Sequence, residues 1–490
     1  MFMAILDIQV VVTSLKTIEE ALDIGADRMS WVQTSYLIAE VIAIPIIGLL
    51  MRVFGMQRLF VGALGVFTLA SIGCAASLGF WDLMGWRVIQ GFAGGVLIPI
   101  VFSAIFLLFP RSLEQTLATT AAGFLAVLAP TLGPVTGGWL TEHYSWHWLF
   151  LINVVPGALA AAAGFLALPG HTTRGRLLRE LDWLSLIAFG MALGFLIVGL
   201  KQAPRDGWLS LLVISLFAAS AIMLVLSVRR TSPAIMFHLL RDRSLAFGCM
   251  LSFILGFILF ASVYILPVFF AFVGGMTPLA IGLITITMGF TQIIAAPVSV
   301  WLDRRFDARL LTAAGFILFA LGLALNARLT VASGEADVWW AQVVRGAAVA
   351  LCILPPIRMA LALQPIAVVS DASGLFNVVR NIGGAIGIAI MDTVMFTRGP
   401  SHADVLMAEM TSNPAAAAQH LGIPLETLPS PDDAMSMMGI MDLIQNASLT
   451  DAINDCWWLL TAASLLALPV LWALGPVESA RPVKGRQPPH

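Results

Sequence analysis

Charged side chains are scarce in this chain. Only 11% of its 490 residues are Asp, Glu, Lys or Arg, whereas 59% are hydrophobic and the mean hydropathy is +0.93. A soluble protein of this length could not cover its surface with so few polar groups. The composition therefore predicts an all-α protein that crosses a lipid bilayer many times.

Cysteine is rare as well, and no enzyme signature is present. The four cysteines lie far apart in apolar segments, without the spacing of a metal site. We find no GxSxG nucleophile elbow, no HExxH motif and no glycine-lysine phosphate loop. The net charge of −2, without a basic patch, gives no indication of nucleic-acid binding. We expect neither an enzyme nor a metal, cofactor or nucleic-acid partner.

Apolar segments recur along almost the whole chain. About 20 residues suffice to cross the roughly 30 Å hydrocarbon core of a membrane, and we count about fourteen such spans. The expected spans are 1–15, 31–50, 59–78, 83–109, 117–140, 148–168, 183–200, 208–228, 245–273, 280–302, 310–325, 338–360, 374–397 and 457–474.

Basic residues gather on one side of the membrane in this arrangement. With the N-terminus inside, most of the 26 Lys and Arg residues lie on the cytoplasmic side, while Arg87, Arg345 and Arg380 lie within spans. This asymmetry follows the positive-inside rule. We therefore predict a multi-pass protein of the bacterial inner membrane with both termini in the cytoplasm.

Two similar stretches indicate an internal repeat. Pro45–Arg58 and Pro297–Arg309 each close the second span of a six-span block with a basic turn, and Arg87 in the fourth span is echoed by Arg345. Repetition on this scale is typical of transporters. The predicted divisions are a first half (1–170), an inserted helix pair (171–240), a second half (241–474) with an outer loop (398–455), and a tail (475–490).

The outer loop is acidic and carries several soft metal ligands. Met435, Met437, Met438, Met441, His402 and His420 leave periplasmic copper binding open as an alternative. We favour short surface helices instead, because the ligands are scattered and Met at helical spacing usually packs on an apolar face.

Asp7 and Arg87 are ionisable residues within spans at similar predicted depths. Asp7 lies roughly 12 Å below the outer end of the first span, and Arg87 roughly 9 Å below that of the fourth. An ionisable residue at mid-membrane costs about 2.5 to 3.5 kcal/mol, so it usually faces a partner or a polar cavity. An aspartate that loses such a partner takes up a proton. The pair is therefore either a proton switch or a static brace of the first half.

Three further ionisable residues lie within predicted spans. Glu40 is near the midplane and is a second candidate for protonation or for cation recognition. Asp392 lies nearer the outer end, where it contributes to coupling or simply reaches interfacial water. Arg380, with Asn377 one turn earlier, lines a cavity from the second half or secures helix packing.

Ala129–Gly138 is rich in proline and glycine although it lies inside the fifth span. Within a membrane, neighbouring helices can satisfy the backbone groups that proline frees, and small residues let those helices approach closely. We therefore expect a bent, tightly packed seam of a moving transporter. Because no nucleotide-binding motif is present, an ion gradient must supply the energy.

Together these residues resemble the major facilitator superfamily, and within it the fourteen-span EmrB/QacA-type drug:proton antiporters. Leu6–Val11 resembles the first-helix aspartate motif, Gly48–Arg58 the loop motif, and Arg87–Gly95 the fourth-helix motif. Gly133–Gly138 resembles the fifth-helix antiporter motif. Other matching stretches are Ser145–Val154 and Phe376–Gly387.

The resemblance implies two six-helix halves with two inserted helices, and roles for particular residues. It assigns proton coupling to Asp7, relay to Arg87 and antiport to the glycine-proline motif. We add Glu40 to the proton-coupling candidates. The antiport motif comprises Gly133, Pro134, Gly137 and Gly138. The candidates for the substrate cavity are Gln9, Gln90, Asn377, Arg380 and Asp392.

The expected cytoplasmic gate departs from the family pattern. The loop motif usually has an acidic residue where this chain has Arg52, whereas the second-half copy keeps Asp303, followed by Arg304. The gating contact has therefore moved to Asp303 or is weakened.

The resemblance also implies a function and partners. We expect proton-coupled efflux of amphipathic, drug-like compounds by alternating access, driven by the proton gradient without a cofactor. Family members in double-membrane bacteria often work with a periplasmic adaptor and an outer-membrane duct, so loop 398–455 is either an adaptor contact or a solvated loop.

Export of an endogenous metabolite, siderophore or lipid-like compound is an alternative. A non-transporting receptor or scaffold is disfavoured, because it has little reason to retain Asp7, Glu40 and Arg87.

Overall fold

The computed structural model describes residues 1–25, 28–109, 112–168, 182–230, 237–303, 305–361, 366–429 and 434–473. Its described part contains helices and no strand, which confirms the all-α fold class. The predicted boundary at residue 170 and the tail 475–490 lie outside the described residues. The division into two halves and an inserted pair stays a prediction.

The first two predicted spans are broken helices. The first consists of α1 (Phe2–Val10), a 3₁₀ turn η1 (Val12–Ser14) and α2 (Leu15–Leu22). The second consists of α3 (Trp31–Ala43), a 3₁₀ turn η2 (Ile44–Ile46) and α4 (Ile47–Phe54). Pro45 lies at the start of η2, where it cannot donate a backbone hydrogen bond. No single piece is long enough to cross a membrane, although each series together is.

Twelve further helical segments in the described part are long and apolar enough to cross a membrane. Twelve of the fourteen predicted spans have a counterpart among these helices, and the other two fall on the broken series, so the count of fourteen stays a prediction. The twelve are α5 (Met56–Ala75), α6 (Phe80–Leu108), α7 (Ser112–His143), α8 (Trp148–Leu151) with α9 (Val154–Ala167), α10 (Trp183–Asp206), α11 (Leu211–Val228), α12 (Arg243–Phe272), α13 (Pro278–Asp303), α14 (Ala308–Asn326), α15 (Glu335–Leu361), α16 (Ile366–Ser412) and α18 (Ala434–Leu465) with α19 (Ala467–Ala473).

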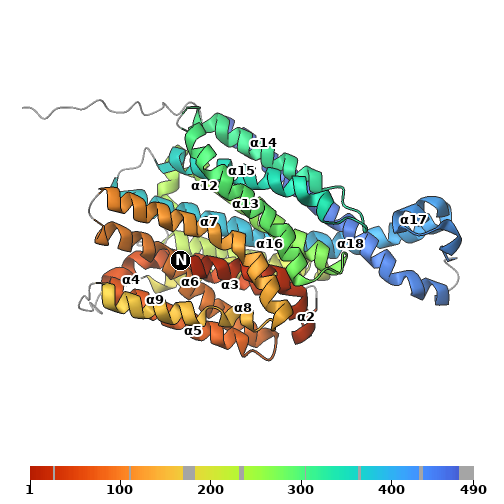
Figure 1. Ribbon diagram of the computed structural model, residues 1–490, viewed down its shortest axis with the longest axis horizontal. Helices are drawn as coiled ribbons and strands as arrows, with labels where there is room; N and C mark the ends of the chain where they lie inside the picture. The colour runs from red at the N-terminus through yellow and green to blue at the C-terminus, as the bar shows by residue number, and fades with distance from the viewer. Residues whose placement is uncertain are drawn as a thin grey trace, which may run out of the picture.

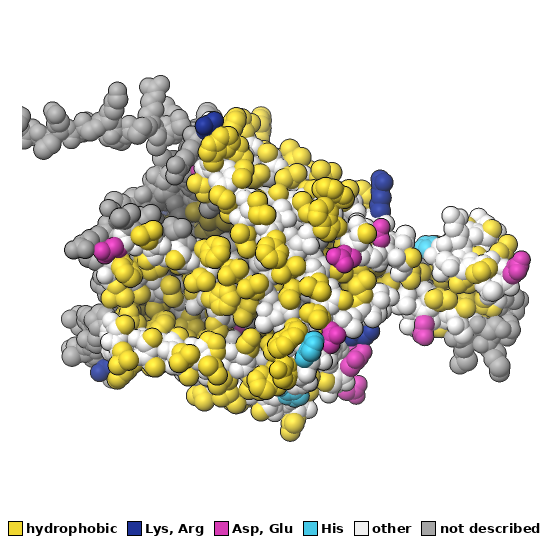
Figure 2. Space-filling model, viewed as in Figure 1, with side chains coloured by type: hydrophobic (Ala, Val, Ile, Leu, Met, Phe, Trp, Pro, Cys, Tyr) yellow, Lys and Arg dark blue, Asp and Glu magenta, His cyan; other side chains and the backbone are white. Residues whose placement is uncertain are grey.

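The helices form an elongated bundle whose members run mostly along its length (Figure 1). Two seams join the predicted halves: α7 packs against α13, and α3 packs against α16. The inserted helix α10 packs against its partner α11 and also against both α3 and α16. Hydrophobic side chains cover much of the visible face of the bundle, as lipid contact requires (Figure 2).

Small residues set the distance between α7 and α13. A Cβ atom built on Gly282 would lie 2.5 Å from the carbonyl oxygen of Pro134, and one on Gly289 would lie 2.5 Å from Oγ1 of Thr131. Gly138 in turn faces the backbone of Pro278. The backbones of the two helices are therefore in direct contact at Gly138 and Gly282, while Gly289 meets the Thr131 side chain.

The outer segment 398–455 is helical over most of its length. Helix α16 continues to Ser412, α17 (Pro414–Leu421) and a 3₁₀ turn η5 (Leu425–Thr427) follow, and α18 begins at Ala434. These elements project from one end of the bundle (Figure 1). The expectation of only short helices here is wrong, because α16 and α18 run on from the membrane. They are stabilised by an apolar cluster of Leu406, Met410, Ala417, Leu421, Ile444 and Ala447.

Three of the copper ligands considered for this segment are engaged in other contacts, whereas Met441 is exposed. His402 lies 2.8 Å from a carboxylate oxygen of Asp455, and His420 lies 3.1 Å from one of Asp451. Met437 packs against the apolar cluster. Within the described ranges no group of three or more His, Cys, Asp or Glu residues is arranged to hold a metal ion. The side chains of Met435 and Met438 lie outside the described residues.

Candidate functional site

A buried ion pair joins α1 to α6. Nη1 of Arg87 lies 2.6 Å from Oδ2 of Asp7, and both side chains are 0% exposed. The other carboxylate oxygen of Asp7 accepts hydrogen bonds from Gln90 at 2.9 Å and from Asn153 at 2.6 Å. The structure thus brings together the two residues that the sequence analysis placed at similar depths in the membrane. The role predicted for them stays a prediction.

The Arg87 guanidinium has partners on three sides. Its Nε donates to the carbonyl oxygen of Val32 at 2.9 Å, and its Nη1 also donates to Gln90 at 2.7 Å. Its central carbon lies 4.5 Å from the centre of the Tyr36 ring and 5.7 Å from that of Phe150. Such enclosure offsets the cost of burying a charge only while the carboxylate partner is present.

Sequence reasoning missed two members of this network. Asn153 lies in Ser145–Val154, a stretch that we matched to the family only in kind, and its bond to Asp7 crosses a long sequence separation. Tyr36 stacks on Arg87 and also donates a hydrogen bond to the carbonyl oxygen of Ala4 at 3.2 Å. The available signal was a buried polar residue in each case, on α3 for Tyr36 and just before α9 for Asn153.

The glycine-proline motif of α7 contacts the helix that carries Asp7. A Cβ atom on Gly133 would lie 2.6 Å from Cβ of Gln9, and Gly137 faces the carbonyl oxygen of Val10. The hydroxyl of Thr13 donates to the carbonyl oxygen of Pro134 at 3.3 Å. Since α7 packs against α13 on another face, it connects the Asp7 helix to the second half.

Glu40 lies in the seam between the halves. Its side chain is buried and forms a hydrogen bond with Asn381 of α16. The positive charge of Arg380, also on α16, is close enough to attract it. No basic residue is near Glu40 in sequence, so only the α3–α16 packing supplies this counter-charge.

Asp392 is bonded to protein groups rather than merely reaching interfacial water. Its Oδ2 lies 3.3 Å from Nζ of Lys201 and accepts a hydrogen bond from Ser30 at 2.9 Å. Its Oδ1 accepts one from Tyr264 at 3.1 Å. The Lys201 and Asp392 side chains are only 8% and 13% exposed. The predicted span 183–200 ends one residue before Lys201, whereas α10 continues to Asp206.

The remaining predicted site residues are dispersed. Gln90 is fully buried within the Asp7 network, whereas Gln9 and Asn377 are partly buried. Asp303 is the last residue of α13. Arg304 lies outside the described residues, as does the side chain of Arg52, which is part of α4. The structure therefore leaves the predicted gate as a prediction.

Arg345 is the second-half counterpart of Arg87. It is buried and donates to Gln342 at 2.7 Å and to Ser262 at 2.6 Å. Its central carbon lies 5.2 Å from the centre of the Trp457 ring. The partners that the structure describes for Arg345 are all uncharged, in contrast to the carboxylate that faces Arg87.

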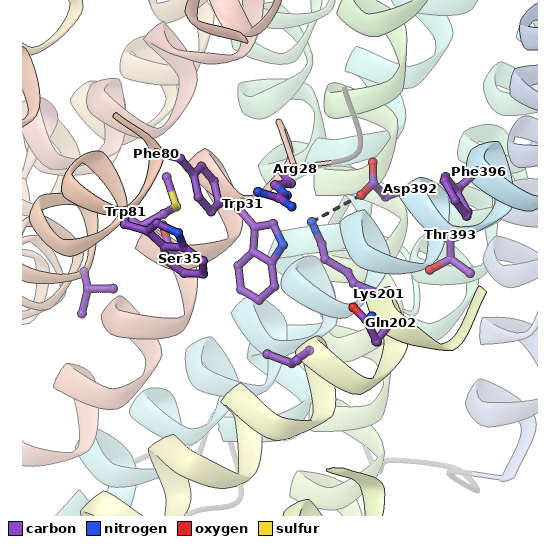
Figure 3. A pocket seen from close by; sticks show the side chains of 13 residues that line it. Arg28, Trp31, Ser35, Phe80, Trp81, Lys201, Gln202, Asp392, Thr393 and Phe396 are labelled. Atoms are coloured by element: carbon purple, nitrogen blue, oxygen red, sulfur yellow. Dashed lines mark ion pairs between the residues drawn. The ribbon is translucent and has the colours of Figure 1, made fainter. Parts of the chain in front are cut away.

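A cavity of about 470 Å³ lies at the end of the bundle predicted to face outward. Its wall includes aromatic residues of α3 and α6 on one side, and Lys201, Asp392 and Phe396 on the other (Figure 3). It is therefore a groove at the junction of the first half, the inserted pair and the second half.

The family model for the Major Facilitator Superfamily matches residues 1–388. The chain belongs to the major facilitator superfamily. Among its curated relatives in this superfamily is the colistin resistance protein EmrB of Acinetobacter baumannii, 33% identical over 415 residues, covering 84% of this chain and 81% of that protein. The multidrug export protein EmrB of Escherichia coli K12 is 28% identical over 483 residues, covering 97% and 93%.

Solved structures of superfamily transporters share the fold. An inward-facing, occupied bacterial homolog of the human lysosomal transporter Spinster matches with a TM-score of 0.64 and 11% identity, covering 96% of this chain and 94% of that one. A D-xylose–proton symporter matches with a TM-score of 0.61 and 13% identity, covering 97% and 95%. At such identities the likeness is one of superfamily fold alone.

Proposed function

We propose that this protein is a proton-coupled exporter of amphipathic, drug-like compounds across the bacterial inner membrane. The observation that carries the proposal is the fully buried ion pair between Asp7 and Arg87. On the same helix as Asp7, Gln9 and Val10 contact the glycine-proline motif of α7. Two relatives in the superfamily are named for colistin resistance and for multidrug export, which supports the same class of cargo.

Protonation of Asp7 is the coupling step. The ionised carboxylate accepts three short hydrogen bonds, from Arg87, Gln90 and Asn153, and Arg87 also donates to Gln90. A proton on Asp7 removes its charge, and with it the attraction that fixes α1 against α6. Substrate binding that re-forms the Asp7–Arg87 pair would expel the proton. Exchange of one proton for substrate on the same site is antiport.

The α7 helix transmits this change to the second half. Gln9 and Val10, two and three residues after Asp7, lie against Gly133 and Gly137, while another side of α7 lies against α13. A small shift of α1 therefore moves a seam whose small residues leave little room to absorb it. Rocking of the halves about this seam is the alternating-access motion.

The energy comes from the proton gradient without a cofactor. One proton that moves through about 150 mV supplies about 3.5 kcal/mol. That energy sustains a roughly 300-fold gradient of solute. Both termini face the cytoplasm in this arrangement, and the α16–α17–α18 extension projects outside, where it is the surface for a periplasmic adaptor and an outer-membrane duct.

An endogenous lipid-like compound is the second candidate cargo. The fatty acid resistance protein FarB of Neisseria gonorrhoeae, 24% identical over 481 residues, carries a name that favours it. The fold and the coupling residues are the same for either cargo, so the two candidates differ only in the substrate.

Transport in reconstituted liposomes tests the proposal. With a pH gradient imposed, we expect wild-type protein to accumulate a lipophilic cation, and Asp7→Asn to lose this accumulation by tenfold or more. Exchange of labelled for unlabelled substrate without a gradient should persist in Asp7→Asn, because it needs no proton. Asp82→Asn, an exposed carboxylate on α6, is the matched control and should behave as wild type. Gradient-driven accumulation by Asp7→Asn would move the coupling role to Glu40 or Asp392.

A further inference from the structure

Four helices of the second half bring buried polar side chains together around Arg345. The helices are α12, α14, α15 and α18, and α14 and α12 each pack against both α15 and α18. We call their five polar residues the Arg345 cluster, and each member is at most 1% exposed: Ser262, Asn326, Gln342, Arg345 and Trp457. The contacts of Arg345 with Gln342, Ser262 and Trp457 are described above. The cluster is therefore a polar site inside an apolar half.

Helix packing places Asn326 at the level of this cluster. A Cβ atom on Gly322 would lie 2.6 Å from Cγ of Arg345, and Asn326 lies one turn further along α14. Beyond the end of that helix, the backbone of Leu329 exchanges two hydrogen bonds with the side chain of Asn454, at 3.0 and 2.8 Å. Asn454 lies one turn before the tryptophan of the cluster. Asn326 is thus between a contact with α15 and a contact with α18.

Several donors of the cluster have no hydrogen-bond partner among the described residues. They are Nε of Arg345, Nε2 of Gln342, Nδ2 of Asn326 and Nε1 of Trp457. One acceptor, Oδ1 of Asn326, is in the same condition. Native proteins rarely leave buried polar groups without a partner, so four such donors in one place indicate a bound group. Because the donors outnumber the acceptor, that group must accept hydrogen bonds.

The first half contains a related arrangement around Arg87. Residues Arg87–Gly91 read R-V-I-Q-G, and Gln342–Gly346 read Q-V-V-R-G, so the arginine and the glutamine have exchanged places. In both stretches Nη1 of the arginine donates to Oε1 of the glutamine at 2.7 Å. The final glycine of each stretch lies against the backbone of a neighbouring helix, at Tyr36 of α3 and Met288 of α13. The two sites are therefore equivalent positions of the internal repeat.

The residue that faces these pairs differs between the halves. In the first half Asp7 accepts a hydrogen bond from Gln90, which lies 83 residues later. In the second half Ser262 is the partner of Arg345, at the same separation of 83 residues. Ser262 thus takes the position of Asp7, but its hydroxyl is neutral and shorter than a carboxylate. In the described residues Arg345 has no carboxylate partner, so the protein supplies the donors here without the anion.

We propose that the Arg345 cluster binds a small monovalent anion, namely chloride, where the first half has the carboxylate of Asp7. Chloride accepts several hydrogen bonds and donates none, and it neutralises a buried guanidinium. Water fits less well, because it brings two donors to a site with one free acceptor. The space gained by replacing a carboxylate with a hydroxyl suits a single-atom anion rather than phosphate. The inference does not rest on the proposed exporter function.

Bound chloride gives the two halves different responses to protons. Asp7 loses its charge when it takes up a proton, whereas chloride keeps its charge at any physiological pH. The first-half site can therefore switch, while the second-half site holds α12, α14, α15 and α18 together throughout.

Thermal unfolding of the purified full-length protein in a neutral detergent measures the binding. Sodium chloride replaces sodium gluconate in steps at constant ionic strength. We expect the melting temperature to rise with chloride and then to saturate, because a ligand of the folded state stabilises it. Arg345→Gln should lose this rise, and Trp457→Phe, which removes one donor, should raise the half-saturating concentration about threefold or more. Arg328→Gln removes an exposed basic residue elsewhere and is the control.

Ser262→Asp supplies the missing anion from the protein itself. In gluconate it should melt at or above the temperature of wild type in saturating chloride, and it should no longer respond to chloride. Ser262→Asn has nearly the same shape without the charge, so it should not gain this stability in gluconate. These two variants and Trp457→Phe keep the test valid where Arg345→Gln fails to fold.

Three results would overturn the proposal. The first is a wild-type protein that melts at the same temperature in both salts, which is the behaviour of a site filled by water. The second is an equal chloride response in wild type and Arg345→Gln, which would place the bound anion elsewhere. The third is a Ser262→Asp variant that keeps the wild-type response to chloride.

Discussion

At the scale of single residues, the two buried arginines have different surroundings. Arg87 faces the carboxylate of Asp7, whereas the partners described for Arg345 are Gln342, Ser262 and the ring of Trp457. Removing one member of a buried ion pair leaves the other as an unpaired charge, which costs about 3 to 5 kcal/mol. Removing a charge that has only neutral partners leaves no such charge behind.

We therefore expect Arg87→Leu to destabilise the protein more than Arg345→Leu. Arg87→Leu leaves Asp7 buried without its cation, while Arg345→Leu leaves neutral hydrogen-bonding groups, at a cost of about 1 to 3 kcal/mol. Melting temperatures of the purified variants in one detergent measure the difference. Adding Asp7→Asn to Arg87→Leu should recover part of the loss. Equal melting temperatures of the two single variants would contradict this view.

At the scale of elements, α10 is held at its start by a polar contact outside the membrane. Asp182 precedes the helix and accepts a hydrogen bond from the backbone N–H of Ser185 at 3.0 Å. It also lies 3.0 Å from Nε of Arg230, which follows α11. The hydrogen bond from Arg230 is the main cause of a lowered pKa of Asp182. The contact therefore joins the start of α10 to the end of α11 on the same side of the membrane.

This lowered pKa predicts a modest loss of stability in acid. The contribution of Asp182 is fully present above its unfolded pKa of about 3.9 and disappears as the pH falls through the lower folded value. We expect Asp182→Asn to reduce the melting temperature slightly at pH 7 and to converge with wild type as the pH falls below the lowered folded pKa of Asp182. The side chain of Arg230 is 41% exposed, so the difference is small. A difference that grows in acid would contradict the assignment.

The α7 helix offers a second test at this scale. Gly137 lies against the backbone of Val10, whereas a Cβ atom on Gly123 of the same helix would have no atom within 4 Å. We expect Gly137→Ala to abolish gradient-driven transport and to lower expression, because α1 must move away. Gly123→Ala should be neutral or should gain up to about 1 kcal/mol from helix propensity. Transport assays and size-exclusion profiles of both variants provide the comparison, and normal transport by Gly137→Ala would rule out a tight seam.

At the scale of the whole molecule, the two seams have different chemistry. The α7–α13 seam packs small residues closely, with backbone contacts at Gly138 and Gly282, whereas the α3–α16 seam carries Glu40 with Arg380 and Ser30 with Asp392. Close small-residue packing suits a pivot, while polar contacts can separate and be hydrated. We therefore infer that the outer end opens along the α3–α16 seam.

A reversible cross-link tests this opening. The hydroxyl of Ser30 lies 2.9 Å from the Asp392 carboxylate, so the two positions are neighbours across this seam, and cysteines placed there provide a test by oxidative cross-linking. We expect the oxidised double variant to stop substrate exchange and the reduced one to resume it, because the closed outer end cannot separate. The single-cysteine variants control for the loss of each side chain, and the four native cysteines are buried. Exchange that continues in the oxidised protein would place the opening elsewhere.

Much of the architecture was predictable because a bilayer imposes local rules. Every spanning segment must be apolar and must satisfy its own backbone, so the sequence by itself determined the membrane class, most helices and the orientation bias. Asp7 and Arg87 were also predictable as partners, since their depths follow from counting residues along two helices. The motif at Gly133–Gly138 indicated close packing, but the sequence did not show which helices it contacts.

Only the tertiary structure decided the remaining contacts. Glu40 meets Arg380, and Asp392 meets Lys201, because α3, α10 and α16 pack together although they are remote in sequence. The breaks within the first two spans and the long outer helices likewise depend on neighbours that residue counting does not reveal. Hydropathy indicates whether a segment lies in lipid or in water. The partner of a buried charge depends instead on which helix faces lie opposite each other.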